Sequence, residues 1–207
     1  MCEKCGFSAA KLKNYLGDQW IRLERITDAA HLLRLEEHQA CELALDDFER
    51  AFPQAFIAIY LGALPNEINV SELGFWLLNQ GAFHTHLLEK RNDYGLVLVI
   101  DPFTRSLALT AGYGIEPCLH QKKTQQILKS VAGSLAKNNT GEALLCMIAD
   151  LRTLLQRAAV KQPRSPKTGS DHGLDVQPLR TGHRMGSHLS PLTRKGNSLT
   201  ASLNEGG

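Results

Sequence analysis

Three acidic residues stand at the ends of two short apolar runs in the middle of the chain. Asp93 precedes the run at residues 96–100, Asp101 follows it directly, and Glu116 comes shortly after a second run that ends at Ala111. Carboxylate oxygens are the ligands that Ca²⁺ and Mg²⁺ prefer in proteins. The residue types therefore suit a hard-cation site, provided that the fold brings at least two of these carboxylates together.

The two apolar runs have the pattern of a β-hairpin. Residues 96–100 are apolar at every position, which predicts a strand buried on both faces. Asp101 and Pro102 favour a tight turn, and residues 106–111 alternate as a second strand does. Asp93 and Asp101 would then lie about 26 Å apart along one extended strand, too far to share an ion. An antiparallel partner strand would instead bring Glu116 back beside Asp93.

A second metal-binding pattern lies at the N-terminus, where Cys2 and Cys5 have the spacing of half a zinc site. Zinc would need two further ligands, from Cys41, His31, His38 or a second chain, and the last case predicts a homodimer through a shared N-terminal zinc site. The alternative is that the thiols are unpaired and reduced. Five cysteines without a signal peptide argue against a disulfide framework.

The remaining pattern predicts helices around these strands. Asp28 is a plausible N-cap for a helix that ends at about Phe52, before Pro53. A strand follows at 55–61, and further helices are expected from residue 71, around 127–135 and over 144–158. This order predicts an α/β fold in which a small mixed β-sheet is sandwiched by helices.

The hairpin and the segment Gly112-Tyr113-Gly114-Ile115-Glu116 that follows it resemble the TPM domain family, over about residues 28–159. That family includes the thylakoid acid phosphatase of photosystem repair. The resemblance implies a metal-assisted phosphatase acting on phosphate monoesters, with Asp93 and Glu116 as catalytic residues and ligands of Ca²⁺ or Mg²⁺. It also implies that Arg105, just after the turn, holds phosphate.

Composition divides the 207 residues into three parts. Residues 1–27 carry the Cys-x-x-Cys segment, 28–160 form one TPM-like domain, and 161–207 hold seven Lys or Arg against three Asp or Glu, without aromatic residues. Such a tail is too polar to offset its ordering entropy, so a disordered basic tail is expected. Its charges are too spaced for specific nucleic-acid binding. With no signal peptide or membrane-length apolar run, we expect a cytoplasmic protein.

Two alternatives to a phosphatase remain open at the level of sequence. The first is a non-catalytic interaction or assembly module on the same fold, which would contact a protein partner through an exposed sheet edge, residues 64–70 or the tail. The second is a zinc-binding module ordered by Cys2 and Cys5.

Overall fold

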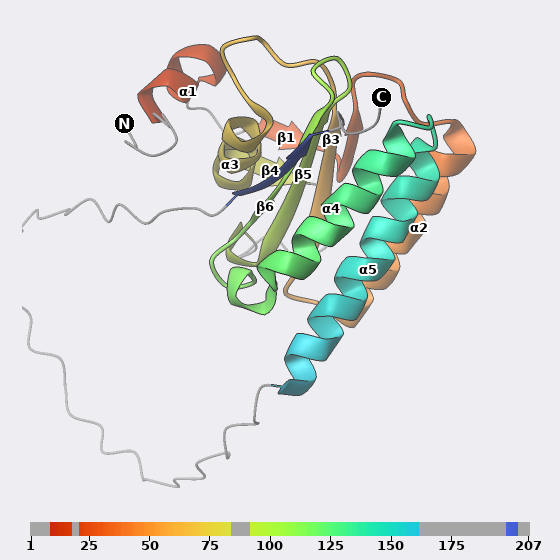
Figure 1. The fold of residues 1–207 in the computed structure, drawn as a ribbon. Helices are drawn as coiled ribbons and strands as arrows, with labels where there is room; N and C mark the ends of the chain where they lie inside the picture. Colours follow the sequence, from red (N-terminus) through yellow and green to blue (C-terminus); the bar gives the residue numbers. More distant parts are fainter. Residues whose placement is uncertain (1–8, 18–20, 84–91, 162–197, 203–207) are drawn as a thin grey trace, which may run out of the picture.

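A computed structural model describes residues 9–17, 21–83, 92–161 and 198–202 (Figure 1). Its centre is a five-stranded mixed sheet between two layers of helices, as the sequence predicts. The first three strands in spatial order are parallel, and the last two are antiparallel to their neighbours. In that order the strands are β2 (Ile26–Asp28), β3 (Phe56–Leu61), β5 (Gly95–Asp101), β6 (Ser106–Ala111) and β7 (Ser198–Ser202).

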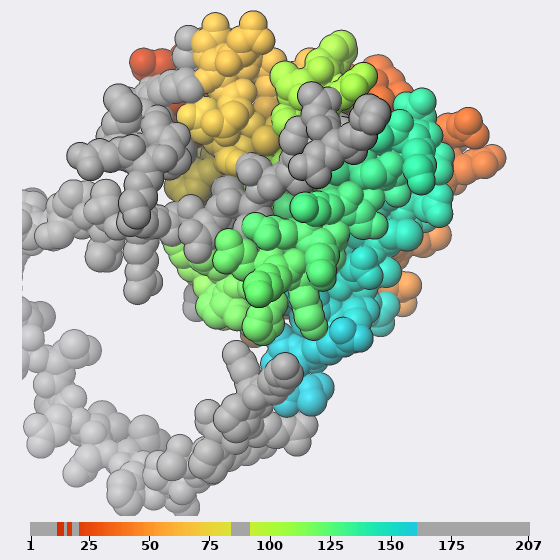
Figure 2. Space-filling view, in the orientation of Figure 1, coloured from red at the N-terminus to blue at the C-terminus, as the bar shows by residue number. Residues whose placement is uncertain are grey.

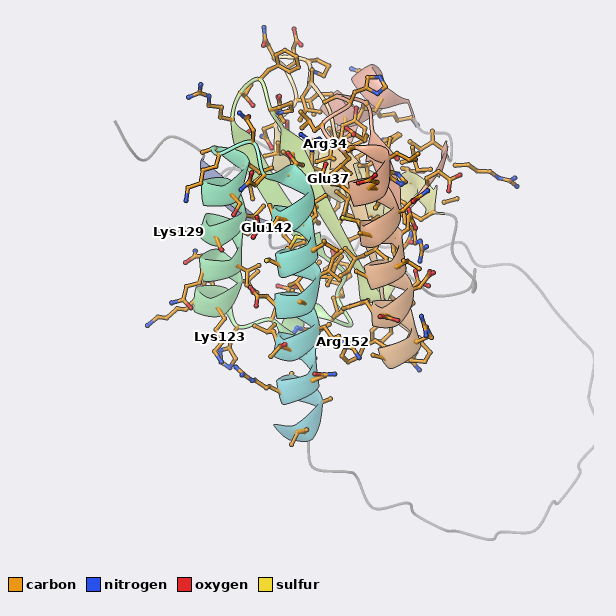
Figure 3. All side chains as sticks on the ribbon, turned by 90° about the vertical axis from the view of Figure 1, so that its right-hand side faces the viewer. Arg34, Glu37, Lys123, Lys129, Glu142 and Arg152 are labelled. Atoms are coloured by element: carbon orange, nitrogen blue, oxygen red, sulfur yellow. The ribbon has the colours of Figure 1, made fainter. Side chains whose placement is uncertain are left out.

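Helices cover both faces of the sheet. Figure 3 shows one layer in which α5 lies between α4 and α2, and Figure 2 shows α4 and α5 forming the outer surface on that side. Helix α3 covers the opposite face, with α1 against it. No helix in the described ranges is long and apolar enough to cross a membrane. The helices are α1 (Ala9–Leu16), α2 (Leu35–Ala51), α3 (Val70–Gln80), α4 (Gln121–Leu135) and α5 (Thr140–Lys161).

Two kinds of short element complete the fold. Strands β1 (Ile21–Leu23) and β4 (Gly81–Phe83) form a separate two-stranded parallel sheet. Two 3₁₀ turns flank the central hairpin: η1 (Asn92–Tyr94) comes before β5, and η2 (Glu116–Cys118) follows β6. These two turns carry Asp93 and Glu116, two of the three acidic residues singled out by the sequence.

Strand β5 is the centre of the sheet, and all seven of its residues are buried. Its side chains alternate between two cores. Leu96, Leu98 and Ile100 belong to the core under α2, α4 and α5. Val97 and Val99 belong to the core under α3. This alternation explains why the run lacks polar residues, because neither face of the strand meets water.

The helix expected to begin at Asp28 begins later, so that prediction is wrong. Asp28 is the last residue of β2, and α2 starts only at Leu35. The Asp28 carboxylate accepts hydrogen bonds from the backbone N–H groups of Leu32 and Leu33, at 3.0 and 2.8 Å. The side chain therefore caps the loop between β2 and α2, a use of Asp that the sequence does not distinguish from an N-cap.

The true start of α2 packs against α5. The Arg34 backbone N–H donates to the Glu37 carboxylate at 2.9 Å, so Glu37 folds back over the first turn. A Cβ added to Gly141 would lie 2.7 Å from the Glu37 Cβ, which shows how closely the two helices approach. Figure 3 shows that both helices begin at the same end of the layer.

An ion-pair cluster fastens the turn between β1 and β2 to α2. The Arg25 guanidinium lies 2.5 Å from Glu42, 2.8 Å from Asp46 and 3.3 Å from Glu49. The three carboxylates follow one another at helical spacing, so they line one side of α2. Burial lowers the pKa of Arg25, but the hydrogen bond to Asp46 and the three nearby carboxylates together raise it above its ordinary value.

Strand β7 lies in the tail that the sequence predicts to be disordered. Its five residues pair antiparallel with β6 (Figure 1). At Ser198–Ser202, main-chain pairing with a sheet edge forms a strand that the sequence does not predict, in a segment that is too polar to form a core by itself. The other tail residues, 162–197 and 203–207, lie outside the described residues.

Candidate functional site

The turn after β6 is held against the turn before β5 by backbone hydrogen bonds. The Gly112 N–H donates to the Gly95 carbonyl at 2.8 Å, and the Gly114 N–H donates to the Asp93 carbonyl at 2.7 Å. The Glu116 N–H donates to the Gly112 carbonyl at 2.9 Å, which closes the second turn. The hairpin thus continues past its strands, and the turn after β6 lies against the turn before β5.

Both glycines of this turn are required by close approach. A Cβ at Gly112 would lie 2.1 Å from the Asn92 carbonyl oxygen, and a Cβ at Gly114 would lie 2.7 Å from the ring of Tyr94. Within the described residues, only Gly17 among the glycines has a positive φ. The two glycines therefore leave no side chain between two touching turns.

The two acidic side chains at this end differ in exposure. Asp93 is exposed in the middle of η1, and Glu116 is partly buried as the first residue of η2. Tyr94 and Tyr113 lie in the same two turns and are 37% and 43% exposed. The site therefore combines two carboxylates with two accessible aromatic side chains.

Arg105 does not belong to this site, so the predicted catalytic trio does not form. It lies in the turn that joins β5 to β6, beside the register pair of Asp101 and Ser106. That turn is at the far end of the hairpin, about 20 Å from Asp93 at the rise of an extended strand. Arg105 is exposed and has a φ of 51°, a conformation in which it shapes the turn.

Asp101 has a structural role at that far end. It is 1% exposed, and its carboxylate accepts hydrogen bonds from the backbone of Phe103 at 2.9 Å, Thr104 at 3.3 Å and Leu64 at 3.4 Å. The first two bonds are those that the turn chemistry predicts. Because its oxygens bind backbone N–H groups, Asp101 holds the β5–β6 turn and the loop after β3 together.

The position of the site departs from a common rule for α/β sheets, in which ligands bind beyond the carboxyl ends of parallel strands. Asp93 and Glu116 lie at the opposite end, where β5 begins. At the carboxyl ends of β2 and β5, the carboxylates of Asp28 and Asp101 bind backbone N–H groups. The antiparallel strand β6 creates the exception, because its own carboxyl end meets the start of β5.

Metal-ligand clusters are absent from the part of the chain that the structure describes. It contains no group of three or more His, Cys, Asp or Glu side chains that could hold a metal ion. Cys2 and Cys5 lie outside the described residues. Cys41, one of the residues expected to complete a zinc site with them, is fully buried. Burial, with smaller contributions from the charges of Glu37 and Glu42, raises the pKa of Cys41 to about 11, whereas zinc binding needs the thiolate.

The sequence interpretation missed the basic residues close to the site. His120 precedes α4, and Lys122 and Lys123 lie in its first turn, only a few residues after Glu116. All three are exposed. A signal for them exists in the sequence, since a helix that begins soon after an acidic loop brings its first residues near that loop.

Comparison with known proteins identifies the family. Residues 26–154 match the family model of the TPM domain. The fold is similar to the NMR structure of the BA42 protein from the psychrophilic bacterium Bizionia argentinensis, with 15% identity, a TM-score of 0.53, and coverage of 63% of this chain and 86% of that one. It is also similar to the N-terminal domain of a protein from P. gingivalis, with 18% identity, a TM-score of 0.53, and coverage of 72% and 88%. No curated protein matches the chain. Because the family model covers more than half of its length, this chain belongs to the TPM domain family.

Proposed function

We propose that this protein is a metal-assisted phosphatase that acts on phosphate monoesters, with Asp93 and Glu116 as the ligands of a Ca²⁺ or Mg²⁺ ion. The observation that carries the proposal is the hydrogen bond from Gly114 to Asp93, which fixes the two acidic turns against each other. Membership of the TPM domain family supports the same reading.

The donor set suits a hard cation in kind and in number. Both side chains offer carboxylate oxygens, and Asp93 is exposed to solvent. Mg²⁺ in proteins is usually held by one or two carboxylates, with water and substrate phosphate in the other positions. Two carboxylates match that pattern, and a site of this kind leaves room for the phosphate of a substrate.

The chain's own residues have distinct roles in this proposal. Asp93 and Glu116 bind the ion, and Gly112 and Gly114 let their turns approach closely enough to do so. A divalent ion held there would polarise the phosphate and lower the pKa of bound water. Tyr113, exposed between the two glycines, borders the place where the ester would lie.

Positive charge for the phosphate comes from the start of α4 in this proposal. Arg105 lies at the other end of the hairpin, so it has no part in binding. His120, Lys122 and Lys123 are exposed and follow η2 directly. Lysine binds phosphate as a point charge without a fixed geometry, which suits an exposed site.

The test is hydrolysis of p-nitrophenyl phosphate by the full-length chain, with and without Ca²⁺ or Mg²⁺, at acidic to neutral pH. We expect metal-dependent turnover that falls roughly tenfold or more in Asp93→Asn, since a ligand of the ion is weakened. Asp47→Asn is the matched control, because Asp47 is an exposed carboxylate that pairs with Arg50 on α2. Equal activity in all three proteins would overturn the proposal.

A further inference from the structure

The fifth strand of the sheet comes from outside the domain that the family model matches. The match ends at residue 154, whereas β7 is formed by Ser198–Ser202 after residues 162–197. Within the matched domain, β6 is therefore an edge strand. Figure 1 shows β7 lying along β6, and β7 also contacts α3 and α4 on either side of that edge.

The hydrogen-bond pattern of the sheet shows which backbone groups of β6 pair with β7. Gly112 donates to Gly95, so these two residues form a hydrogen-bonded pair of the β5–β6 ladder. Along an antiparallel ladder, hydrogen-bonded pairs of residues alternate with pairs that are not hydrogen-bonded. Ala108 and Thr110 therefore bond to β5, and the backbone groups of the residue before each of them point away from β5. Those residues are Leu107 and Leu109, and they stand opposite Ala201 and Leu199 of β7.

An empty edge at this place would be unfavourable. The side chains of Leu107 and Leu109 are 0% and 2% exposed, so both residues lie in the core. Without a partner strand, their N–H and C=O groups would be unpaired beside an apolar core, and buried backbone groups without partners are rare in folded proteins. A row of unpaired backbone groups is a ready template for another strand.

We propose that the β6 edge is a docking site for an extended peptide, and that Ser198–Ser202 are its tethered, displaceable occupant. Main-chain hydrogen bonds supply most of the affinity in this mode of recognition, and alternate side chains supply specificity. The protein partner that fits is an extended segment with small or apolar residues opposite Leu107 and Leu109, the pattern that β7 itself presents. Docking in cis has an effective concentration on the order of millimolar. A partner must therefore be present near that concentration or bind the edge more tightly than β7 does.

The test is amide hydrogen exchange in the full-length protein, compared with Ala201→Pro. Proline removes the N–H that faces Leu107, so we expect the amides of Leu107 and Leu109 to exchange at least roughly tenfold faster. Ala108 and Thr110 should keep their protection, because they bond to β5. Ser187→Pro, a substitution of the same kind elsewhere in the tail, should leave the exchange rates of all four amides unchanged.

A peptide of residues 195–205, added at millimolar concentration, should restore protection of Leu107 and Leu109 in the Ala201→Pro protein. The same peptide with proline at 201 should fail. Unchanged exchange in Ala201→Pro, or no rescue by the unsubstituted peptide, would overturn the proposal. Protection in the unmutated protein that depends on protein concentration would overturn the tethered assignment, since a second copy would then supply the strand.

Loss of protection at Ala108 and Thr110 would show that Ala201→Pro unfolds the protein. A second variant keeps the test decisive in that case. Leu199→Asp leaves the backbone donor in place and puts a charged residue in register with Leu109, which is buried. It must raise exchange at Leu107 and Leu109 alone, and unchanged exchange there would overturn the proposal.

Discussion

The backbone N–H of Gly114 donates a hydrogen bond to the carbonyl oxygen of Asp93, with 2.7 Å between nitrogen and oxygen. This one bond joins the turn before β5 to the turn after β6. Gly114 is two residues before Glu116, so the bond holds the turn of the exposed Asp93 against the turn that leads to Glu116. The site therefore depends on backbone packing as much as on its acidic side chains.

Gly112→Ala should destabilise the protein. The new Cβ would lie 2.1 Å from the Asn92 carbonyl oxygen, so one turn must move. We expect the free energy of unfolding, measured in urea, to fall by about 1–3 kcal/mol, as for other overpacked sites. Gly133→Ala is the matched control: its Cβ would meet nothing within 4 Å inside α4, so it should stabilise by about 0.5–1 kcal/mol. Equal effects would contradict the close approach.

Asp101→Ala and Asp93→Ala should separate a structural carboxylate from a functional one. Asp101 is buried and accepts backbone hydrogen bonds from Phe103 and Thr104, so its loss should cost about 1–3 kcal/mol of unfolding free energy. Asp93 is exposed, and its removal should change stability by less than about 0.5 kcal/mol in metal-free buffer. Thermal or urea unfolding of both variants tests this, and the reverse order would be incompatible with the assignment.

Arg25→Met should loosen the contact between the β1–β2 turn and α2. The substitution removes the guanidinium from Glu49, which is only 8% exposed, and from two further carboxylates. We expect a loss of about 1–3 kcal/mol in unfolding free energy. Arg50→Met, which breaks the exposed pair with Asp47, should cost less than about 1 kcal/mol. A loss no larger for Arg25 than for Arg50 would show that the cluster does not stabilise the fold.

Cys41 should make stability fall in alkaline solution. Burial first, and the charges of Glu37 and Glu42 second, raise its pKa from 9.0 to about 11. Between these values the unfolded chain releases the thiol proton while the folded chain keeps it. The unfolded state therefore binds fewer protons, and the free energy of unfolding falls by up to about 1.4 kcal/mol per pH unit. Urea unfolding from pH 8 to 11 should show a steeper fall in the free energy of unfolding for the unmutated protein than for Cys41→Ala. Parallel pH profiles would refute it.

The central part of the fold follows from sequence because hydrophobic pattern specifies it. The all-apolar run in β5 can only be satisfied by a strand with a core on both faces, and α5 carries a clear apolar stripe. The error at Asp28 has a different cause, because a carboxylate that caps a loop and one that caps a helix look alike in sequence. Strand β7 was missed because its order comes from the β6 edge, which no local pattern of the tail reveals.

The site was predictable in part. The meeting of the turns that carry Asp93 and Glu116 follows from the hairpin, since strand register decides which ends meet. The placement of Arg105 in the same site was wrong for the same reason: it stands in the turn at the other end. The basic residues at the start of α4 were missed although they follow Glu116 closely in the sequence, and η2 decides the direction in which the chain enters α4.

The most direct test of the account is isothermal titration of metal-free, full-length protein with Mg²⁺ and with Ca²⁺. We expect one ion to bind per chain, with binding weakened roughly tenfold or more in Asp93→Asn and in Glu116→Gln. Arg105→Gln should bind as the unmutated protein does, because its side chain lies at the other end of the hairpin. No binding to the unmutated protein, or equal binding to the two carboxylate variants, would contradict a metal site between Asp93 and Glu116.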